Sequence, residues 1–241
     1  IEELPEYVQN TNITVQHIEQ GHVFDLEIHV YYEQEHASVR IVDTHTNIVQ
    51  IEKNWQVIFE DKTTSLELKA DHSALIMKQI WDFSQTVDID DVKEILDRQI
   101  TCNMAIANEG IHNSYGANIG HVILNMDSDC VKTRAKAYAA AGSDARMNGC
   151  ELPVVINSGS GNQGITCCVP VVVYAKELDC TQKQLYRALV LSNLTAIYIK
   201  TGIGTLSAFC GAVSAGAAAG AGIAYLHNGT YKEIQHTIVN A

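Results

Sequence analysis

The spacing of the apolar residues changes near residue 70, and this change constrains the fold more than any other feature of the chain. Before it, apolar and polar residues alternate in short runs, as in antiparallel strands with one solvated face. After it, apolar residues recur every three to four positions, which is the spacing of amphipathic helices. We therefore expect an α+β protein, with a β-rich subdomain over residues 1–70 packed with a mainly helical domain over residues 71–241.

The expected strands all precede residue 70, and the expected helices follow residue 71. The alternating runs cover residues 13–18, 23–31, 38–42, 48–51 and 55–59, with a turn at Lys53–Asn54 before the last run. Helices are expected over residues 75–83, from Asp88 or Asp90 to Ile100 with Ile95 on the apolar face, from about 128 to 141, after Asn157–Gly164, and over 181–197, 210–226 and 231–239. Thr181 and Gln184 have the spacing of a capping box.

The charge and the cysteines exclude several classes of protein. A formal net charge of −12 argues against nucleic acid or an anionic membrane surface as a partner, because both bind basic patches. Seven cysteines without regular spacing indicate reduced thiols in a cytoplasmic protein and no disulfide framework. The uncharged stretch 204–226 is rich in Ala and Gly, so we interpret it as a buried helix and not as a membrane span. No signal peptide is visible, and a chain that begins with Ile1 is expected to be a fragment or a processed product.

The stretch Asn157–Gly164 holds three glycines, two hydroxyls and three side-chain amides, with no charge and no bulky apolar group. Apolar runs lead into it and out of it. Glycines allow backbone N–H groups to gather around an anion, so one interpretation is a ligand cradle. The other interpretation is a tight turn between two buried elements, and the pattern alone does not decide between them.

Three further residues are candidates for chemistry, and each has a structural alternative. Arg146 could bind a substrate carboxylate through two parallel hydrogen bonds, or it could pair with Asp144 or another exposed acid. Cys210 lies at the expected start of a helix, which favours the metal-ligating thiolate, although a lone cysteine often serves packing alone. His45 lies between two expected strands and could act as a general base or only as a hydrogen-bonding loop residue.

Taken together, four segments in this order resemble one known family. They are His45–Val49, Ser143–Met147, Asn157–Thr166 and Ser192–Ile199. They are similar to the L-cysteine desulfidase family, also called the UPF0597 group, which is related to the alpha chain of iron–sulfur L-serine dehydratases. The resemblance runs from about residue 38 to the C-terminus, and four ordered motifs are much more specific than one glycine-rich loop.

The resemblance implies an oxygen-sensitive lyase with a 4Fe–4S cluster, which carries out β-elimination on L-cysteine or L-serine and takes part in amino-acid catabolism. The implied products are pyruvate, ammonia, and sulfide or water. Three cysteines hold the cluster in such enzymes, and Cys210 matches one of these positions. The residues expected to bind the amino-acid substrate are Asn157, Ser158, Gly159, Ser160, Gly161, Asn162, Gln163 and Arg146, with His45 as the expected base.

Two cysteine-containing motifs of the family are missing from this chain, namely the N-terminal Cys-Thr-Glu-Pro motif and a motif downstream of position 241. We therefore expect the chain to be the middle of a longer protein, with one cluster ligand of three. Alone, it is expected to lack both the cluster and lyase activity. Family members usually have Gly-Gly before the His-Thr-Asn motif, where this chain has Asp43–Thr44.

Two other functions stay open at this point. Ser160–Asn162 is similar to the Ser/Thr-Gly-Asn loop of pyridoxal-phosphate dehydratases, which also need a Schiff-base lysine upstream. The nearest upstream lysines, Lys132 and Lys136, fall in an expected amphipathic helix. Alternatively, the β-rich part is a non-catalytic module for binding a small molecule or for oligomerisation, which leaves a homo-oligomer open.

Overall fold

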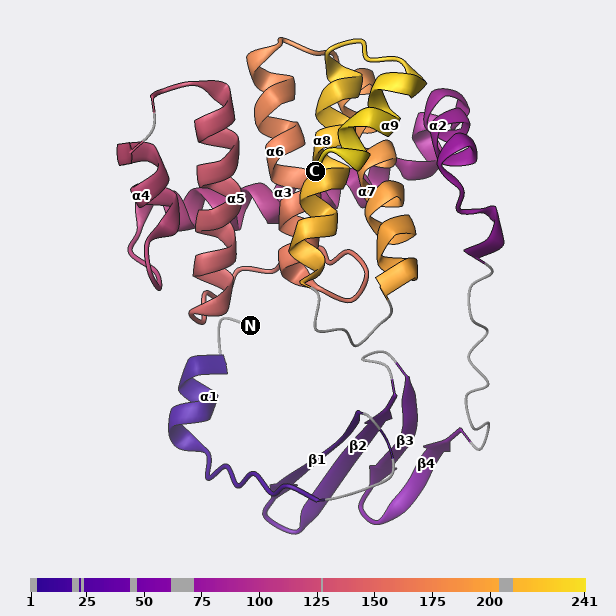
Figure 1. Ribbon diagram of the computed structural model, residues 1–241. Coiled ribbons are helices and arrows are strands. Elements are labelled where there is room, and N and C mark those ends of the chain that lie inside the picture. Colours follow the sequence, from indigo (N-terminus) through magenta and orange to yellow (C-terminus); the bar gives the residue numbers. More distant parts are fainter. Residues whose placement is uncertain are drawn as a thin grey trace. The chain divides into compact units, whose positions relative to one another are not determined.

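The computed structural model describes residues 4–18, 22, 24–43, 47–61, 72–126, 128–203 and 210–241. The chain divides into two compact units, Ile1–Ala70 and Asp71–Ala241, which are described separately (Figure 1). Unit 1 contains an antiparallel sheet and unit 2 is built from helices. This combination confirms the α+β class.

Unit 1 is a short helix followed by a β-meander. Its elements are α1 (Leu4–Asn10), β1 (Asp25–Tyr32), β2 (Glu35–Val42), β3 (Ile48–Lys53) and β4 (Gln56–Glu60), and the four strands pair antiparallel in the order β1-β2-β3-β4. Four of the five expected strands are confirmed. The turn before β4 falls at Asn54–Trp55, one residue later than expected, and both residues have positive φ.

The expected strand over residues 13–18 is wrong, because this segment is irregular. Its alternating apolar side chains remain in solvent, with Val15 90% exposed and Ile18 64% exposed. Alternation predicts a strand only where a neighbouring strand supplies hydrogen bonds and the apolar side is covered. Among the described residues, neither condition holds for this segment.

The two faces of the sheet in unit 1 differ in chemistry. The β1–β2 register places Glu27 opposite Arg40 and Tyr31 opposite His36, so one face is polar. On this face His36 and Ser38 are buried. The other face carries the apolar side chains of β1, and these are 41–51% exposed at Leu26, Ile28 and Val30.

Unit 2 is a bundle in which α3 passes across several of the other helices (Figure 1). Five of the expected helices begin within two residues of the expected position, and the short helix α4 was not expected. The elements are η1 (His72–Ala74), α2 (Met77–Thr86), α3 (Ile89–His112), α4 (Ile119–Met126), α5 (Val131–Met147), α6 (Gly161–Glu177), α7 (Gln182–Ile203), α8 (Gly211–Leu226) and α9 (Tyr231–Val239).

Capping residues fix several of these helix starts. Asp88 Oδ1 accepts a hydrogen bond from the N–H of Asp90 at 3.2 Å, which confirms one of the two expected caps of α3. Thr181 and Gln184 form the expected capping box before α7, since each side chain accepts a bond from the other's backbone N–H. However, Ile95 on α3 is 60% exposed and does not belong to the expected apolar face.

Helix α6 lies at the centre of the apolar core of unit 2 and packs on α5, α7 and α8. Ile165 and Val169 on α6 and Leu189 on α7 are fully buried. Cys167 and Cys168 are also fully buried, and burial raises the pKa of the Cys167 thiol to about 12. At Gly222 on α8 an added Cβ would lie 2.9 Å from the Ala188 carbonyl oxygen, so this glycine lets α8 approach α7 closely.

All seven cysteines are free thiols. Among the helices in the described ranges, none combines the length and the apolar character that a membrane span requires. The part of the stretch 204–226 that the structure describes is the helix α8, and most of its small side chains are buried in unit 2.

Candidate active site

The stretch Asn157–Gly164 divides into a tight turn and the first turn of α6. Asn157 and Ser160 exchange both backbone hydrogen bonds, at 3.1 Å and 3.0 Å. Between them Ser158 and Gly159 have φ values of 48° and 78°, the backbone of a type I′ turn. The turn interpretation is therefore confirmed for the first half of the stretch. Residues 161–164, expected as loop, are helical instead, because Ser160 caps α6 by accepting a bond from the Gln163 N–H at 3.5 Å.

A chain of hydrogen-bonded side-chain amides connects this turn to the core helices α3 and α7. Asn157 Nδ2 donates to Asn193 Oδ1 at 3.0 Å and to the Asn193 carbonyl oxygen at 3.2 Å. Asn193 on α7 and Gln99 on α3 face each other as a closed amide pair, with N–O distances of 2.8 Å and 2.9 Å. The buried Asn157 is thereby tied to two core helices, and its Oδ1 accepts a further bond from the Ser158 hydroxyl at 2.9 Å.

A second amide holds the segment that leads into the turn. Asn103, fully buried on α3, donates to the Val155 carbonyl oxygen at 3.1 Å and accepts from the Val155 N–H at 2.8 Å. The sequence interpretation gave no role to Gln99 or Asn103. Their four-residue spacing, which places them on one face of the helix with Leu96 and Ile106, was the available signal, because buried amides on one helix face require partners.

Arg146 lies across the start of α6. Its Nη1 donates to Asn162 Oδ1 at 3.2 Å, and a Cβ built on Gly161 would lie 2.2 Å from Arg146 Nε. The alternative pairing with Asp144 is wrong, because Asp144 Oδ2 accepts from the Ile119 N–H instead. In the part of the chain that the structure describes, no carboxylate forms an ion pair with Arg146.

The start of α6 therefore combines three groups that favour an anion. The first N–H groups of a helix have no acceptor within the helix, and the helix dipole adds a partial positive charge. The half-buried guanidinium of Arg146 supplies a full positive charge beside them. Such an arrangement binds carboxylate or phosphate groups.

Gln163 connects the start of α6 with the start of α8. Its side chain is 4% exposed, and a Cβ built on Gly211 would lie 2.3 Å from its Cδ and Nε2 atoms. Gly211 is the first residue of α8 and follows Cys210, the N-cap residue. Because Gly211 has no side chain, the Gln163 amide can occupy the space beside it. Cys210, the preceding residue, therefore lies close to the glycine-rich stretch.

The described residues do not by themselves form a site for a metal or a cluster. Cys210 is exposed, and among the described ranges no three His, Cys, Asp or Glu side chains lie together as metal ligands would. A 4Fe–4S cluster uses several thiolates, and here the candidate site offers one. The cluster therefore stays a prediction that other parts of a longer protein would have to complete.

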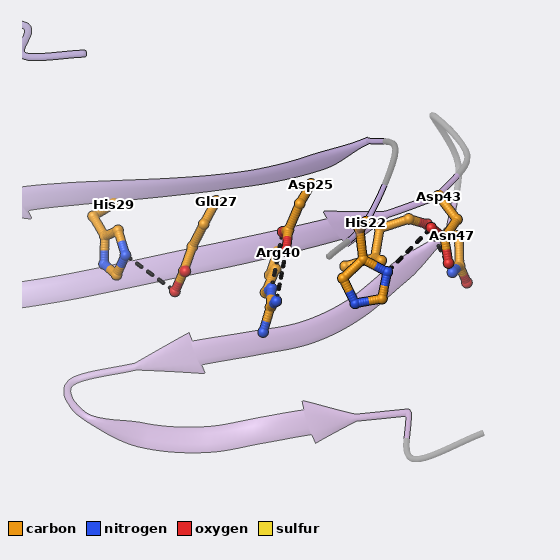
Figure 2. Close-up of polar contacts among 8 residues, drawn as sticks. His22, Asp25, Glu27, His29, Arg40, Asp43 and Asn47 are labelled. Atoms are coloured by element: carbon orange, nitrogen blue, oxygen red, sulfur yellow. Dashed lines mark hydrogen bonds and ion pairs between the residues drawn. The ribbon is translucent and has the colours of Figure 1, made fainter. Parts of the chain in front are cut away.

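His45, the expected base, lies outside the described residues. The residues that flank its segment are described and belong to unit 1 (Figure 2). Val42 and Asn47 close the segment with a backbone bond of 3.1 Å and a side-chain bond of 2.9 Å from Asn47 Nδ2. Asp43 has a φ of 64°, a conformation that glycine adopts easily, so the departure from Gly-Gly at this position keeps a glycine-like backbone.

Other charged groups of unit 1 pair with one another, on and beside β1 and β2 (Figure 2). Arg40 and Asp25 form two hydrogen bonds, of 3.0 Å and 2.7 Å, and the Arg40 guanidinium lowers the pKa of Asp25. His29 lies 3.1 Å from Glu27, and His22 lies 3.2 Å from Asp43. We interpret these pairs as supports of the sheet.

A surface hollow of about 570 Å³ opens between the starts of α3 and α7. Lys93 and Lys183 lie on its wall, together with Tyr186, whose pKa is raised by burial and by its hydrogen bond to Asp97. None of the expected site residues lines it. The candidate site therefore remains at the start of α6.

Comparison with known proteins decides the family. The sequence model described as serine dehydratase alpha chain matches residues 23–241. The chain belongs to this family. The family is named for a dehydratase, which is a lyase, and the expected relationship is confirmed.

Curated relatives of the chain include UPF0597 proteins of bacteria. One from Desulfitobacterium hafniense is 51% identical over 242 residues, which is 100% of this chain and 56% of the relative. One from Lachnoclostridium phytofermentans is 54% identical over 203 residues, covering 84% of this chain and 49% of the relative. One from Fusobacterium nucleatum is 39% identical over 233 residues, covering 91% of this chain and 55% of the relative.

The chain thus spans about half the length of the curated relatives that it matches. No solved structure gives a significant match. The family is established by these similarities, and the reaction and the cofactor of the whole protein are matters for proposal.

Proposed function

We propose that the longer protein to which this chain corresponds is a lyase that carries out β-elimination on L-cysteine or L-serine. The observation that carries the proposal is the start of α6, where Arg146 lies across Gly161 without an acidic partner among the described residues. A cation and free helix N–H groups suit the carboxylate that every α-amino acid carries. Membership of the serine dehydratase alpha chain family supports the same substrate class.

In this proposal the residues at the start of α6 bind and orient the substrate. Arg146 and the first N–H groups of α6 hold the carboxylate, and Ser158, Ser160 and Asn162 offer further hydrogen bonds from the same turn. The amide chain through Asn157, Asn193 and Gln99 holds this turn in place before substrate arrives.

The overall reaction removes the α-proton and the β-substituent of the amino acid. Loss of sulfide from cysteine, or of water from serine, leaves aminoacrylate, which hydrolyses to pyruvate and ammonia. His45 is the proposed base for the α-proton. Cys210 is the proposed ligand that this chain contributes to a 4Fe–4S cluster, with the remaining ligands in the longer, cytoplasmic protein.

The pyridoxal-phosphate alternative has less support from the described residues. It requires a lysine that reaches the cofactor beside the Ser160–Asn162 segment. Lys132 and Lys136 are exposed on α5. The non-catalytic alternative has no support from the start of α6, because an arginine without an acidic partner among the described residues suits anion binding better than packing.

The proposal is tested on the full-length protein, purified without oxygen. L-cysteine and L-serine are supplied separately, and pyruvate, ammonia and sulfide are measured together with bound iron and the visible absorption. We expect pyruvate from at least one substrate, and a broad iron–sulfur absorption that air removes along with the activity.

Two controls separate the alternatives. A discrete absorption band that hydroxylamine removes would favour pyridoxal phosphate and contradict the proposed cluster. The 241-residue chain measured alone is expected to release no sulfide from L-cysteine, so release by this chain would contradict the proposal that the site is shared with other parts of the protein.

A further inference from the structure

Gln163 carries a buried hydrogen-bond acceptor that lacks a donor. Its side chain is 4% exposed, and its Oε1 atom is buried without a hydrogen-bond partner among the described residues. An amide oxygen can only accept hydrogen bonds. Most buried polar atoms in proteins have a partner, so an acceptor without one in a candidate site indicates a donor that arrives from outside.

The position of this acceptor is defined by two helices. Gln163 belongs to the first turn of α6, and its side chain lies against Gly211, the first residue of α8. Side chains at a helix start lean toward the N-terminal end. The Gln163 amide therefore lies where the starts of the two helices meet. Cys210, the N-cap residue of α8, directly precedes Gly211 in the sequence.

Arg146 and Gln163 flank the same helix start from different sides. Arg146 lies against Gly161, and Gln163 follows two residues later, which corresponds to about 200° around a helix. One side of the helix start thus presents a positive charge, and the opposite side presents a neutral acceptor. This asymmetry matches an amino-acid zwitterion, whose carboxylate needs donors and whose ammonium group needs acceptors.

The two groups of a zwitterion have a single favourable assignment here. A carboxylate facing Gln163 Oε1 would place two acceptors together, and an ammonium group facing Arg146 would place two positive charges together. A thiol is only a weak donor, so the β-thiol of cysteine satisfies Oε1 poorly. The ammonium group, with three N–H donors, is the substrate group that fits Oε1.

We propose that Gln163 Oε1 accepts a hydrogen bond from the α-ammonium group of the substrate and so selects α-amino acids over carboxylates that lack the amino group. This inference rests on the proposed function, because it assumes that Arg146 and the start of α6 hold the substrate carboxylate. It assigns a separate role to Gln163, which discriminates between ligands that bind Arg146 equally well.

The test compares two ligands that differ in the amino group alone. L-cysteine and 3-mercaptopropionate share the thiol and the carboxylate, and their apparent dissociation constants are measured by thermal shift on the anaerobic full-length protein. Gln163→Leu removes the acceptor at similar size, and Gln163→Glu keeps an acceptor at the same position. Arg146→Ala serves as the matched control, because both ligands carry the carboxylate.

We expect Gln163→Leu to weaken L-cysteine binding about tenfold or more, and to change 3-mercaptopropionate binding by about twofold at most. Gln163→Glu is expected to retain the preference for L-cysteine, and Arg146→Ala to weaken both ligands together. Equal weakening of both ligands by Gln163→Leu, or no change in either, overturns the inference. The unliganded melting temperature of each variant shows whether the variant is folded.

The same samples keep this inference separate from the proposed reaction. If the wild-type protein prefers L-cysteine through Gln163 but forms no pyruvate, then the ammonium site stands and the proposed β-elimination fails. If pyruvate forms and Gln163→Leu leaves the preference unchanged, then the reaction stands and the role of Gln163 is wrong. If the wild-type protein binds neither ligand, the inference is overturned.

Discussion

The two units of the chain bury opposite kinds of side chain. In unit 2 the fully buried residues are mostly apolar, as at Ile165 and Leu189. In unit 1 the buried residues within the described ranges are His36, Ser38 and Val42, while the apolar face of β1 stays in solvent. Unit 2 therefore contains its own hydrophobic core, whereas the sheet of unit 1 depends on its hydrogen-bonded ladder and on polar pairs such as Asp25–Arg40.

This difference also explains where a precise binding site can form. The turn before α6 and the segment leading into it are held by amides that project from core helices, so the core helices position this turn. The charged groups of unit 1 bond to one another across a sheet. Unit 2 consequently offers a site whose cation, Arg146, has no acidic partner among the described residues, and unit 1 offers paired charges.

The contrast between the two units is tested most strongly by removing one large apolar side chain from each unit. Leu189→Ala in unit 2 is expected to lower the free energy of unfolding by about 2–5 kcal/mol, because it leaves a cavity in a close-packed core. Ile28→Ala in unit 1, where the side chain is 51% exposed, is expected to cost about 0.5 kcal/mol or less.

Urea unfolding followed by circular dichroism measures both variants. A loss at Ile28→Ala as large as that at Leu189→Ala would break the comparison, because it would mean that the apolar face of the sheet is packed in solution. A small loss at both positions would contradict the account of the core of unit 2.

An intermediate loss of stability is expected when the amide chain that holds the turn is broken. Asn193→Leu leaves the Gln99 and Asn157 amides without their partner, so we expect a loss of about 2 kcal/mol in the free energy of unfolding of unit 2. Asn108→Leu, at an exposed position on α3, is the matched control and is expected to change the stability by about 0.5 kcal/mol at most. Equal losses at the two positions would show that the amide chain does not support the turn.

The smallest effect is expected from the ion pair of unit 1. The Arg40 guanidinium holds the pKa of Asp25 below its ordinary value of 3.8, so the pair stabilises unit 1 fully above that value. This stability is lost as the pH falls through the lowered pKa of Asp25. The contribution is about 1 kcal/mol or less, because such pairs are screened by solvent and salt.

A carbon-detected NMR titration of the Asp25 carboxyl group measures this pKa directly. In the Arg40→Gln variant the pKa is expected to return toward 3.8, and the acid-induced loss of stability is expected to shrink. An Asp25 pKa that is the same in both proteins would contradict the ion pair as the cause.

Local patterns predicted the elements well where their partners lie close in the sequence. The period change, the Thr181–Gln184 capping box and the final helix Tyr231–Val239 were all correct, since each depends on neighbouring residues alone. The strand expected at residues 13–18 failed because a strand also requires a partner. Helix α6 continues through Pro170, which lacks an N–H and normally ends a helix, because tertiary packing holds both halves.

The candidate site was predicted in part. The glycine-rich stretch predicted the tight turn, but α6 begins inside the stretch, at Gly161, and the structure places Arg146 beside that start. The supporting amides were missed because Gln99 is 94 residues from Asn193, and no local pattern connects them. Whether Arg146 pairs with Asp144 or stays available for a ligand also depended on the contact of Asp144 with α4.

The central claim is that Arg146 holds the carboxylate of the substrate at the start of α6. It is tested most directly by steady-state pyruvate formation from L-cysteine by the anaerobic full-length protein and its Arg146→Lys and Arg146→Ala variants. Loss of a charge-assisted pair of about 2–3 kcal/mol predicts that kcat/KM falls about 30- to 150-fold in Arg146→Ala, with partial recovery in Arg146→Lys. An unchanged kcat/KM in Arg146→Ala, with the fold intact, would contradict the claim.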